Sequence, residues 1–196
     1  MLIRGFKSWC ENVAVQLRKD LGLTPIEPLD VGALTDWLSV DVWTPHQIPG
    51  LESKWTHILL NKDANAWSAV TLAVNSKNLI ILNPSHSKAR QASDLTHELA
   101  HILIEHEAGR VDISPDGLLM LSTYNRDQEN EANWMAGCLL LPREALAVTM
   151  KQQIDFEATA KKFGVSRDML RWRMNVTGVQ RQFAGNHKRI PVRLLR

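Results

Sequence analysis

The pattern of hydrophobic and polar residues predicts helices at the start of the chain. Hydrophobic residues return every three or four positions in residues 5–21, and Gly22 follows as a stop signal. The same period over residues 29–38 predicts a second helix. Residues 40–43 are then typical of a short strand, and a proline-rich loop follows it.

The next segment is expected to form a small antiparallel sheet. Three runs of apolar and β-branched residues are separated by turn-forming residues, and they comprise residues 55–60, 67–74 and 79–82. The third run leads into an amphipathic helix that Gly109 ends, with Ser87 or Ser93 as its candidate cap. Residues 110–125 then look like a loop with an apolar island at residues 118–121.

The remainder of the chain is predicted to be helical. The expected helices comprise residues 126–141, 143–152, 155–163 and 166–174. Pro142 separates the first two helices, and Gly164 separates the last two. The last pair, about residues 155–175, has the pattern of a helix–turn–helix, in which Ser166 can cap the second helix.

The composition is that of an ordinary globular protein. The chain has 196 residues, 44% of them hydrophobic and 22% charged, which suits one domain, or one domain with a small appendage. With the predicted elements, we expect a single α+β domain over residues 1–196. Two cysteines, Cys10 and Cys138, are too few for a disulfide framework, and Cys138 is expected in the core. Because the chain has no signal-peptide pattern and no apolar run long enough to cross a membrane, we expect a cytoplasmic protein.

One pentad, His97-Glu98-Leu99-Ala100-His101, has the pattern H-E-x-x-H. Residues four apart on a helix lie about 40° apart around its axis, so His97 and His101 point the same way and can bind one Zn²⁺. Glu98 lies beside that position, where it can act as general base toward a metal-bound water. The alternative is a packed helix on which two histidines happen to lie four positions apart.

A catalytic zinc site needs a third protein ligand, and residues 126–141 offer two candidates. Glu129 shares a helix face with small side chains that allow a close approach to the pentad helix. Glu131 lies about 200° away, so both carboxylates cannot face one metal. We therefore predict Glu129 as ligand, with Glu131 as the alternative and Asn133 as a hydrogen-bonding neighbour. A solvated helix face would explain the same acids without a metal.

Together these stretches resemble the ImmA/IrrE family of metallopeptidase-like proteins. The resemblance covers roughly residues 66–177. The motifs that carry it are the pentad, Leu82-Asn83-Pro84, Arg90, the run E-N-E-A-N-W-M-A-G-C-L-L-L-P from Glu129 to Pro142, and Phe163-Gly164-Val165-Ser166. The resemblance implies a zincin-like fold with a gluzincin-like site. It also implies that His97, His101 and Glu129 are the metal ligands and that Glu98 is the catalytic glutamate.

The same resemblance implies a function. Members of the family are typically bacterial or carried by phages and mobile elements, and they are linked to cleavage of, or control over, helix–turn–helix repressors. We therefore expect a zinc-dependent endopeptidase that hydrolyses a peptide bond in a partner protein. That partner would be a repressor or antitoxin-like regulator.

Two other functions stay open at this point. The 155–175 segment carries Arg167, Arg171 and Arg173, so the protein is alternatively a DNA-binding regulator with a structural or vestigial metal site. The net charge of only +2 weighs against DNA, although five basic and no acidic residues follow from Arg181 onward. A catalytically silent sensor that binds a ligand in the pocket is the third alternative.

An oxyanion-stabilising donor besides the metal would complete a peptidase site. The candidates are Tyr124, His106, His86 and His57, and the sequence does not choose among them. His106 is also explained as a histidine at a helix carboxyl end, where the helix dipole favours it.

Overall fold

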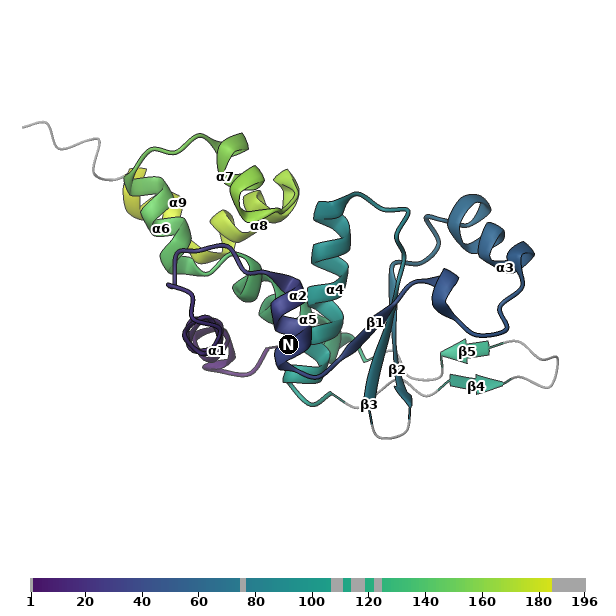
Figure 1. The fold of residues 1–196 in the computed structure, drawn as a ribbon. Coiled ribbons are helices and arrows are strands. Elements are labelled where there is room, and N and C mark those ends of the chain that lie inside the picture. The colour runs from purple at the N-terminus through teal and green to yellow at the C-terminus, as the bar shows by residue number, and fades with distance from the viewer. Residues whose placement is uncertain (1, 75–76, 107–110, 114–118, 122–124, 185–196) are drawn as a thin grey trace, which may run out of the picture.

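The computed structural model describes residues 2–74, 77–106, 111–113, 119–121 and 125–184. Its helices are α1 (Phe6–Asp20), α2 (Val31–Trp37), α3 (Ser53–His57), α4 (Lys88–Leu103), α5 (Arg126–Leu140), α6 (Arg143–Lys151), α7 (Phe156–Phe163), α8 (Arg167–Thr177) and α9 (Val179–Ala184). Helices α6 to α9 gather at one end of the molecule and α3 lies at the other, with α4 and α5 between them (Figure 1). The predicted α+β class is confirmed.

A three-stranded sheet lies beside α4. It contains β1 (Asp41–Trp43), β2 (Ala69–Val74) and β3 (Lys77–Leu82) in the order β1-β3-β2. β2 and β3 are antiparallel, but β1 runs parallel to β3, so the expectation of a purely antiparallel sheet is wrong. Parallel strands cannot be joined by a tight turn, and the long connection between β1 and β2 provides the crossover that lets β3 return between them.

The strand predicted over residues 55–60 is also wrong. This segment forms α3 and a π-helical turn, η2 (Ile58–Lys62), and a 3₁₀ turn, η1 (Pro45–Gln47), precedes them. Short apolar runs suit a strand or a helix equally well. Here Trp55, Ile58 and Leu59 lie at the i, i+3, i+4 spacing of a helix, which the prediction overlooked.

The expected loop after the pentad helix contains a second sheet. β4 (Val111–Ile113) pairs antiparallel with β5 (Leu119–Leu121), with Ile113 opposite Leu119. The described part of the predicted apolar island, Leu119–Leu121, therefore forms a strand. The pentad helix ends at Leu103 and not at Gly109 as predicted, because Glu105 already adopts the left-handed conformation that turns the chain away. Gly109 and Tyr124 themselves lie outside the described residues.

Helices α4 and α5 pack against each other, and α4 also packs on β2 and β3. The side chain of Ser87, rather than that of Ser93, caps α4 by accepting a hydrogen bond from the Arg90 amide. Asn125 caps α5 by accepting from the amides of Asp127 and Gln128. These caps satisfy amide groups that a helix start leaves without partners, so both helices begin at defined positions.

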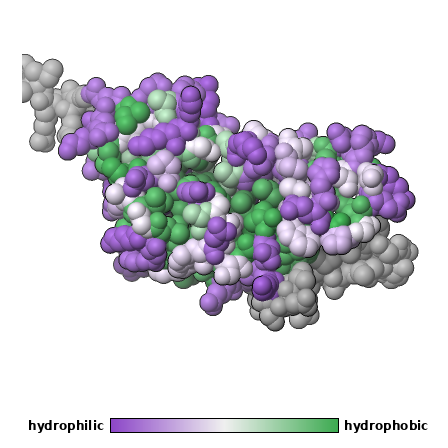
Figure 2. Space-filling view, viewed as in Figure 1, coloured by the Kyte–Doolittle hydropathy of each residue, from purple (hydrophilic) through white to green (hydrophobic). Residues whose placement is uncertain are grey.

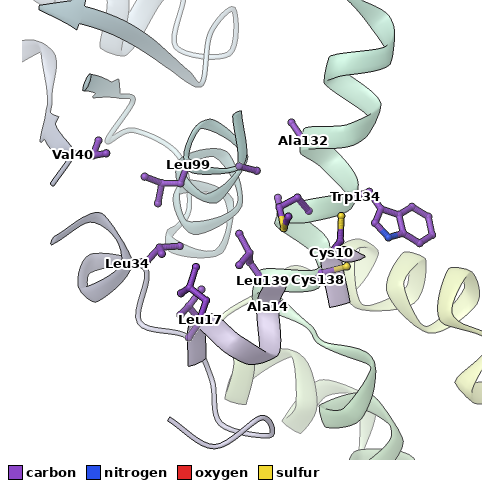
Figure 3. Close-up of a cluster of buried hydrophobic side chains, with 14 of the residues drawn as sticks. Cys10, Ala14, Leu17, Leu34, Val40, Leu99, Ala132, Trp134, Cys138 and Leu139 are labelled. Atoms are coloured by element: carbon purple, nitrogen blue, oxygen red, sulfur yellow. The ribbon is translucent and has the colours of Figure 1, made fainter. Parts of the chain in front are cut away.

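The main core joins α1, α2, α4 and α5 (Figure 3). Leu34, Leu99 and Leu139 are fully buried there. Cys10 and Cys138 are buried and lie next to each other, so the expectation that Cys138 is a core residue is confirmed. Their mutual hydrogen bond and burial raise the pKa of the Cys138 thiol, which favours the unreactive thiol form.

Two fully buried arginines hold the carboxyl end of α5. Arg18 of α1 donates from Nη2 to the Leu139 carbonyl at 2.6 Å, and Arg173 of α8 donates from Nη2 to the Leu141 carbonyl at 2.9 Å. The last carbonyls of a helix have no partners within it and carry partial negative charge. The two guanidinium groups therefore tie α1 and α8 to the same helix end.

The carboxyl-terminal helices form a second buried cluster with the end of α5. Ser166 caps α8 and Gly164 ends α7 with a φ of +63°, as the helix–turn–helix pattern predicts. Helix α9 was not predicted. In Figure 2, hydrophilic side chains cover most of this helical group and of the α3 end, and hydrophobic side chains are visible between them. Among the described helices, none is long and apolar enough to cross a membrane.

Candidate metal centre

Three predicted ligands converge between α4 and α5. His97 Nε2 and His101 Nε2 lie 3.1 Å apart. Glu129 places Oε2 3.2 Å from His97 Nε2 and Oε1 3.5 Å from His101 Nε2. The pentad spacing explains the histidine pair, and the small Ala132 and Ala136 of α5, both buried, explain the close approach of the two helices.

These distances fit a single small cation. Two ligands bound tetrahedrally at about 2.0–2.1 Å from Zn²⁺ lie about 3.3 Å from each other. The three donor atoms of His97, His101 and Glu129 all lie within 4.8 Å of one another. Two imidazoles and one carboxylate are also the ligand types that catalytic zinc sites use. The cluster can therefore hold a metal ion, and three protein ligands leave one coordination position open.

The protonation state of His101 suits this role. Burial, with contributions from His97 and His106, lowers the pKa of His101 to about 4. The ring is therefore neutral near pH 7 and keeps a lone pair on one nitrogen. A histidine binds a metal only in this form.

Glu98 lies beside the three ligands and contacts the sheet. Its Oε2 accepts a hydrogen bond from the Thr71 hydroxyl of β2 at 2.5 Å. Burial raises the pKa of Glu98, while the Thr71 hydrogen bond and nearby His97 act in the opposite direction. A carboxyl group with a raised pKa accepts and releases a proton more readily near neutral pH than an exposed one does.

A hydrogen-bonded chain extends from the far side of His101. His106 Nδ1 lies 2.9 Å from His101 Nδ1, and His106 Nε2 lies 3.1 Å from Glu131 Oε2. Glu131, the alternative third ligand, thus contacts His106 and is not one of the three clustered ligands. This hydrogen-bonded chain was not predicted from the sequence. The opposite placement of Glu129 and Glu131 on one helix was the pattern that could have indicated it, because it gives the two carboxylates different partners.

The other candidates lie elsewhere. Asn133 is exposed and lines a pocket of about 600 Å³ that is also lined by Ser93, Met169 and Trp172. His86 is buried, with Nε2 3.0 Å from the Ala64 carbonyl and Nδ1 3.4 Å from Asp94. His57 lies on α3 within 3.3 Å of Asn61. None of these contacts places a donor toward the cluster, and Tyr124 lies outside the described residues.

The arginines of the helix–turn–helix pattern all have partners within the chain. Arg167 pairs with Glu157 at 2.8 Å, and Arg171 pairs with Asp168 at 2.8 Å. Arg173 is fully buried and pairs with Glu11 at 2.6 Å, so it cannot reach a DNA surface. The basic segment after Arg181 lies mostly outside the described residues.

A family model described as the IrrE N-terminal-like domain, of a peptidase family, matches residues 57–175. The chain belongs to this family. The membership confirms the resemblance to the ImmA/IrrE family and the zincin-like fold. It also agrees with the position of the cluster, because α4 and α5 both lie within the matched residues.

A solved structure described as a Mycobacterium tuberculosis transcriptional regulator is similar in fold, with a TM-score of 0.51 and 16% sequence identity. The similarity covers 83% of this chain but only 45% of that one, so the chain spans about half the length of the regulator. At this identity the similarity concerns the fold alone. The comparison with curated proteins finds no match.

Proposed function

We propose that this member of the IrrE N-terminal-like family is a zinc-dependent endopeptidase. His97, His101 and Glu129 would hold Zn²⁺, and Glu98 would act as general base. The observation that carries the proposal is the convergence of two imidazole nitrogens and a carboxylate within 4.8 Å, with a buried glutamate next to them. Membership of a peptidase family supports the same reaction.

The chemistry divides between the metal and the chain. Bound Zn²⁺ supplies a Lewis acid that polarises a carbonyl and lowers the pKa of a water. Glu98 would accept a proton from the water whose oxygen attacks the peptide carbonyl carbon, and it would deliver that proton to the amine nitrogen as the C–N bond breaks. Burial raises the pKa of Glu98 toward the range this exchange requires. Thr71 holds the Glu98 carboxylate in place through its hydroxyl.

Two features favour a polypeptide substrate. β2 is an outer strand of the three-stranded sheet, and it also carries Thr71, so the edge of β2 that pairs with no other described strand runs close to Glu98. An extended peptide can add to such an edge through backbone hydrogen bonds. The pocket of about 600 Å³ offers room for side chains, because Ser93 and Asn133 lie one helical turn from His97 and Glu129.

The substrate that we propose is a regulatory protein of the repressor or antitoxin type, encoded by a phage or mobile element and present in the same cytoplasm. This part of the proposal rests on the resemblance to the ImmA/IrrE family. DNA binding by α7 and α8 is less favoured, because Arg167 and Arg171 are ion-paired and Arg173 is buried. We also propose that residues 1–196 form one folding unit.

The first test is the metal content of the purified protein and of three variants. We expect about one zinc per chain in the wild type and in Glu98→Ala, and little or none in His97→Ala and Glu129→Ala. If only Glu98→Ala lost its zinc, Glu98 would be a ligand and not the general base. A wild-type protein that holds no zinc even after reloading would overturn the peptidase proposal and favour DNA binding.

The second test looks for cleavage in host cells. Newly formed protein amino termini are labelled and compared between cells that express the wild type and cells that express Glu98→Gln. We expect termini within a regulatory protein that appear with the wild type only, followed by cleavage of that purified protein in vitro. Equal sets of termini in both cultures, with zinc bound in both proteins, would contradict proteolysis.

A further inference from the structure

We propose that His106 and Glu131 are positioning residues that hold the His101 imidazole in the orientation and tautomer needed to bind the metal. The proposal rests on the proposed function in one respect, which is that His101 is a ligand. It assigns a role to two residues that lie outside the three-ligand cluster. The hydrogen-bonded chain Glu131–His106–His101 carries it.

Only one placement of protons along these hydrogen bonds leaves Nε2 of His101 free to bind a metal. If Nε2 of His101 keeps its lone pair for the metal, the ring carries its hydrogen on Nδ1, which donates to His106 Nδ1 at 2.9 Å. His106 then carries its hydrogen on Nε2, which donates to Glu131 Oε2 at 3.1 Å. Every donor meets an acceptor in this arrangement, and the chain ends on a carboxylate.

The contact between His106 and His101 is largely shielded from water. Its side chain is only 6% exposed, and that of Glu131 is 21% exposed. The rings of His101 and His106 meet nearly edge-on, with centroids 4.9 Å apart and planes at 69°. Water competes weakly at such a site, so the orientation of one ring constrains the orientation of the other.

The backbone at the end of α4 places His106 there. Glu105 adopts the left-handed conformation, with a φ of +58°. Its amide bonds to the Ile102 carbonyl, and the His106 amide bonds back to the His101 carbonyl at 3.0 Å. This Schellman-type ending turns the chain back, so that a residue beyond the helix reaches the ring of His101. A non-glycine residue in this conformation is uncommon and costs energy.

Helix α5 therefore approaches His101 from two sides. Glu129 faces its Nε2 directly, at 3.5 Å, and Glu131 reaches its Nδ1 through His106. Two carboxylates about 200° apart on one helix can do this only because His106 spans the distance to the second one. A ligand histidine whose other nitrogen donates toward a carboxylate is a more basic and better-oriented ligand.

The test measures the affinity for zinc itself, by competition with a chromophoric chelator. His106→Ala and Glu131→Ala are expected to bind Zn²⁺ about 10- to 100-fold more weakly than the wild type. His106→Gln should recover most of the affinity, because its amide oxygen can accept from His101 and its amide nitrogen can donate to Glu131. Equal affinity of His106→Ala and the wild type would overturn the proposal.

His86→Gln is the matched control. His86 is also a buried histidine, 4% exposed, with both ring nitrogens near acceptors, but it contacts no predicted ligand. We expect it to lower the stability of the zinc-free protein in urea while leaving the zinc affinity within about 3-fold of the wild type, the difference that separates a structural effect from the 10- to 100-fold expected above. An equally large loss of affinity in His86→Gln would mean that the His106 effect is general destabilisation, which also overturns the proposal.

Nitrogen-15 NMR of the zinc-loaded wild type provides a readout that needs no variant. The hydrogen bonds from His101 through His106 to Glu131 require that His101 carries its hydrogen on Nδ1 and that His106 carries its hydrogen on Nε2. The opposite tautomer of His106 would contradict the chain. A complete loss of zinc in both His106→Ala and His106→Gln, as in His101→Ala, would instead make His106 a ligand. If the wild type binds no zinc, the proposed function itself is contradicted. If the wild type binds zinc and the His106 and Glu131 variants bind it equally well, only the positioning role is contradicted.

Discussion

Thr71 on β2 donates a hydrogen bond from its hydroxyl to Glu98 on α4, with 2.5 Å between the two oxygens. This bond joins the sheet to the residue that we propose as general base. It also opposes the effect of burial on Glu98, since burial raises the pKa of that carboxyl and the hydrogen bond lowers it.

Replacing Thr71 by Val should therefore shift the pH dependence of cleavage. Without the donor the pKa of Glu98 rises further, so a larger fraction is protonated at neutral pH and cannot accept a proton. We expect the acidic limb of the kcat/KM profile to move to higher pH by about one unit, so that the rate at a given pH on that limb falls by about 10-fold, the effect of losing roughly 1.4 kcal/mol. Thr71→Ser keeps the hydroxyl and should retain the wild-type profile. An unchanged profile in Thr71→Val would show that the hydrogen bond has no role in tuning Glu98.

The left-handed residue Glu105 makes a prediction about stability. Its φ of +58° suits glycine and disfavours β-branched side chains. We expect Glu105→Val to lower the free energy of unfolding by about 1–2 kcal/mol and Glu105→Gly to leave it unchanged or raise it slightly. Urea unfolding of the zinc-free proteins measures both. A glycine variant less stable than the valine variant would argue against a left-handed helix ending here.

Side chains of α8 lie directly against the backbone of α5 at Gly137. A Cβ atom there would overlap the Trp172 ring and approach Arg173 Cδ to 2.9 Å. Alanine is favoured over glycine inside a helix by about 1 kcal/mol, but overpacking costs about 1–3 kcal/mol. Trp172 is also packed edge-on against Trp134, which limits how far it can move aside. We therefore expect Gly137→Ala to destabilise the protein by up to about 2 kcal/mol net.

In the double variant Gly137→Ala/Trp172→Leu, the smaller leucine side chain should remove the overlap between residue 172 and the new Cβ atom of residue 137. We expect the double variant to be more stable than the sum of the two single effects predicts, in thermal or urea unfolding. Additive effects would indicate that Gly137 and Trp172 do not compete for the same space.

Two arginines of α8 should differ sharply in their effect on stability. Arg173 is fully buried and pairs with Glu11, whereas Arg167 pairs with Glu157 on the surface, where both side chains are more than half exposed. Removing one partner of a buried pair costs about 3–5 kcal/mol, while an exposed pair contributes about 0–1 kcal/mol. We therefore expect Arg173→Met to be severely destabilised and Arg167→Met to unfold like the wild type. Similar midpoints for the two variants in urea would contradict the buried role of Arg173.

Local patterns in the sequence were enough to predict most helices and the residues of the candidate metal centre. The period of hydrophobic residues placed α1, α5 and the α7–α8 pair within a few residues of their observed bounds, and it placed α4 correctly except for its end, which lies at Leu103 and not at Gly109. Helical geometry also predicted that His97 and His101 share a face and that Glu129 and Glu131 do not. These features depend on residues within a few turns of one another, so the sequence determines them without knowledge of the rest of the chain.

Only the tertiary structure decided how distant segments meet. The parallel pairing of β1 with β3 depends on a crossover, and a short apolar run such as residues 55–60 takes its form from what packs around it. The contact of Thr71 with Glu98, and the chain from His101 through His106 to Glu131, join residues from different elements. A hydrogen bond needs its two atoms within about 3 Å, and sequence spacing does not specify that distance for residues on separate elements.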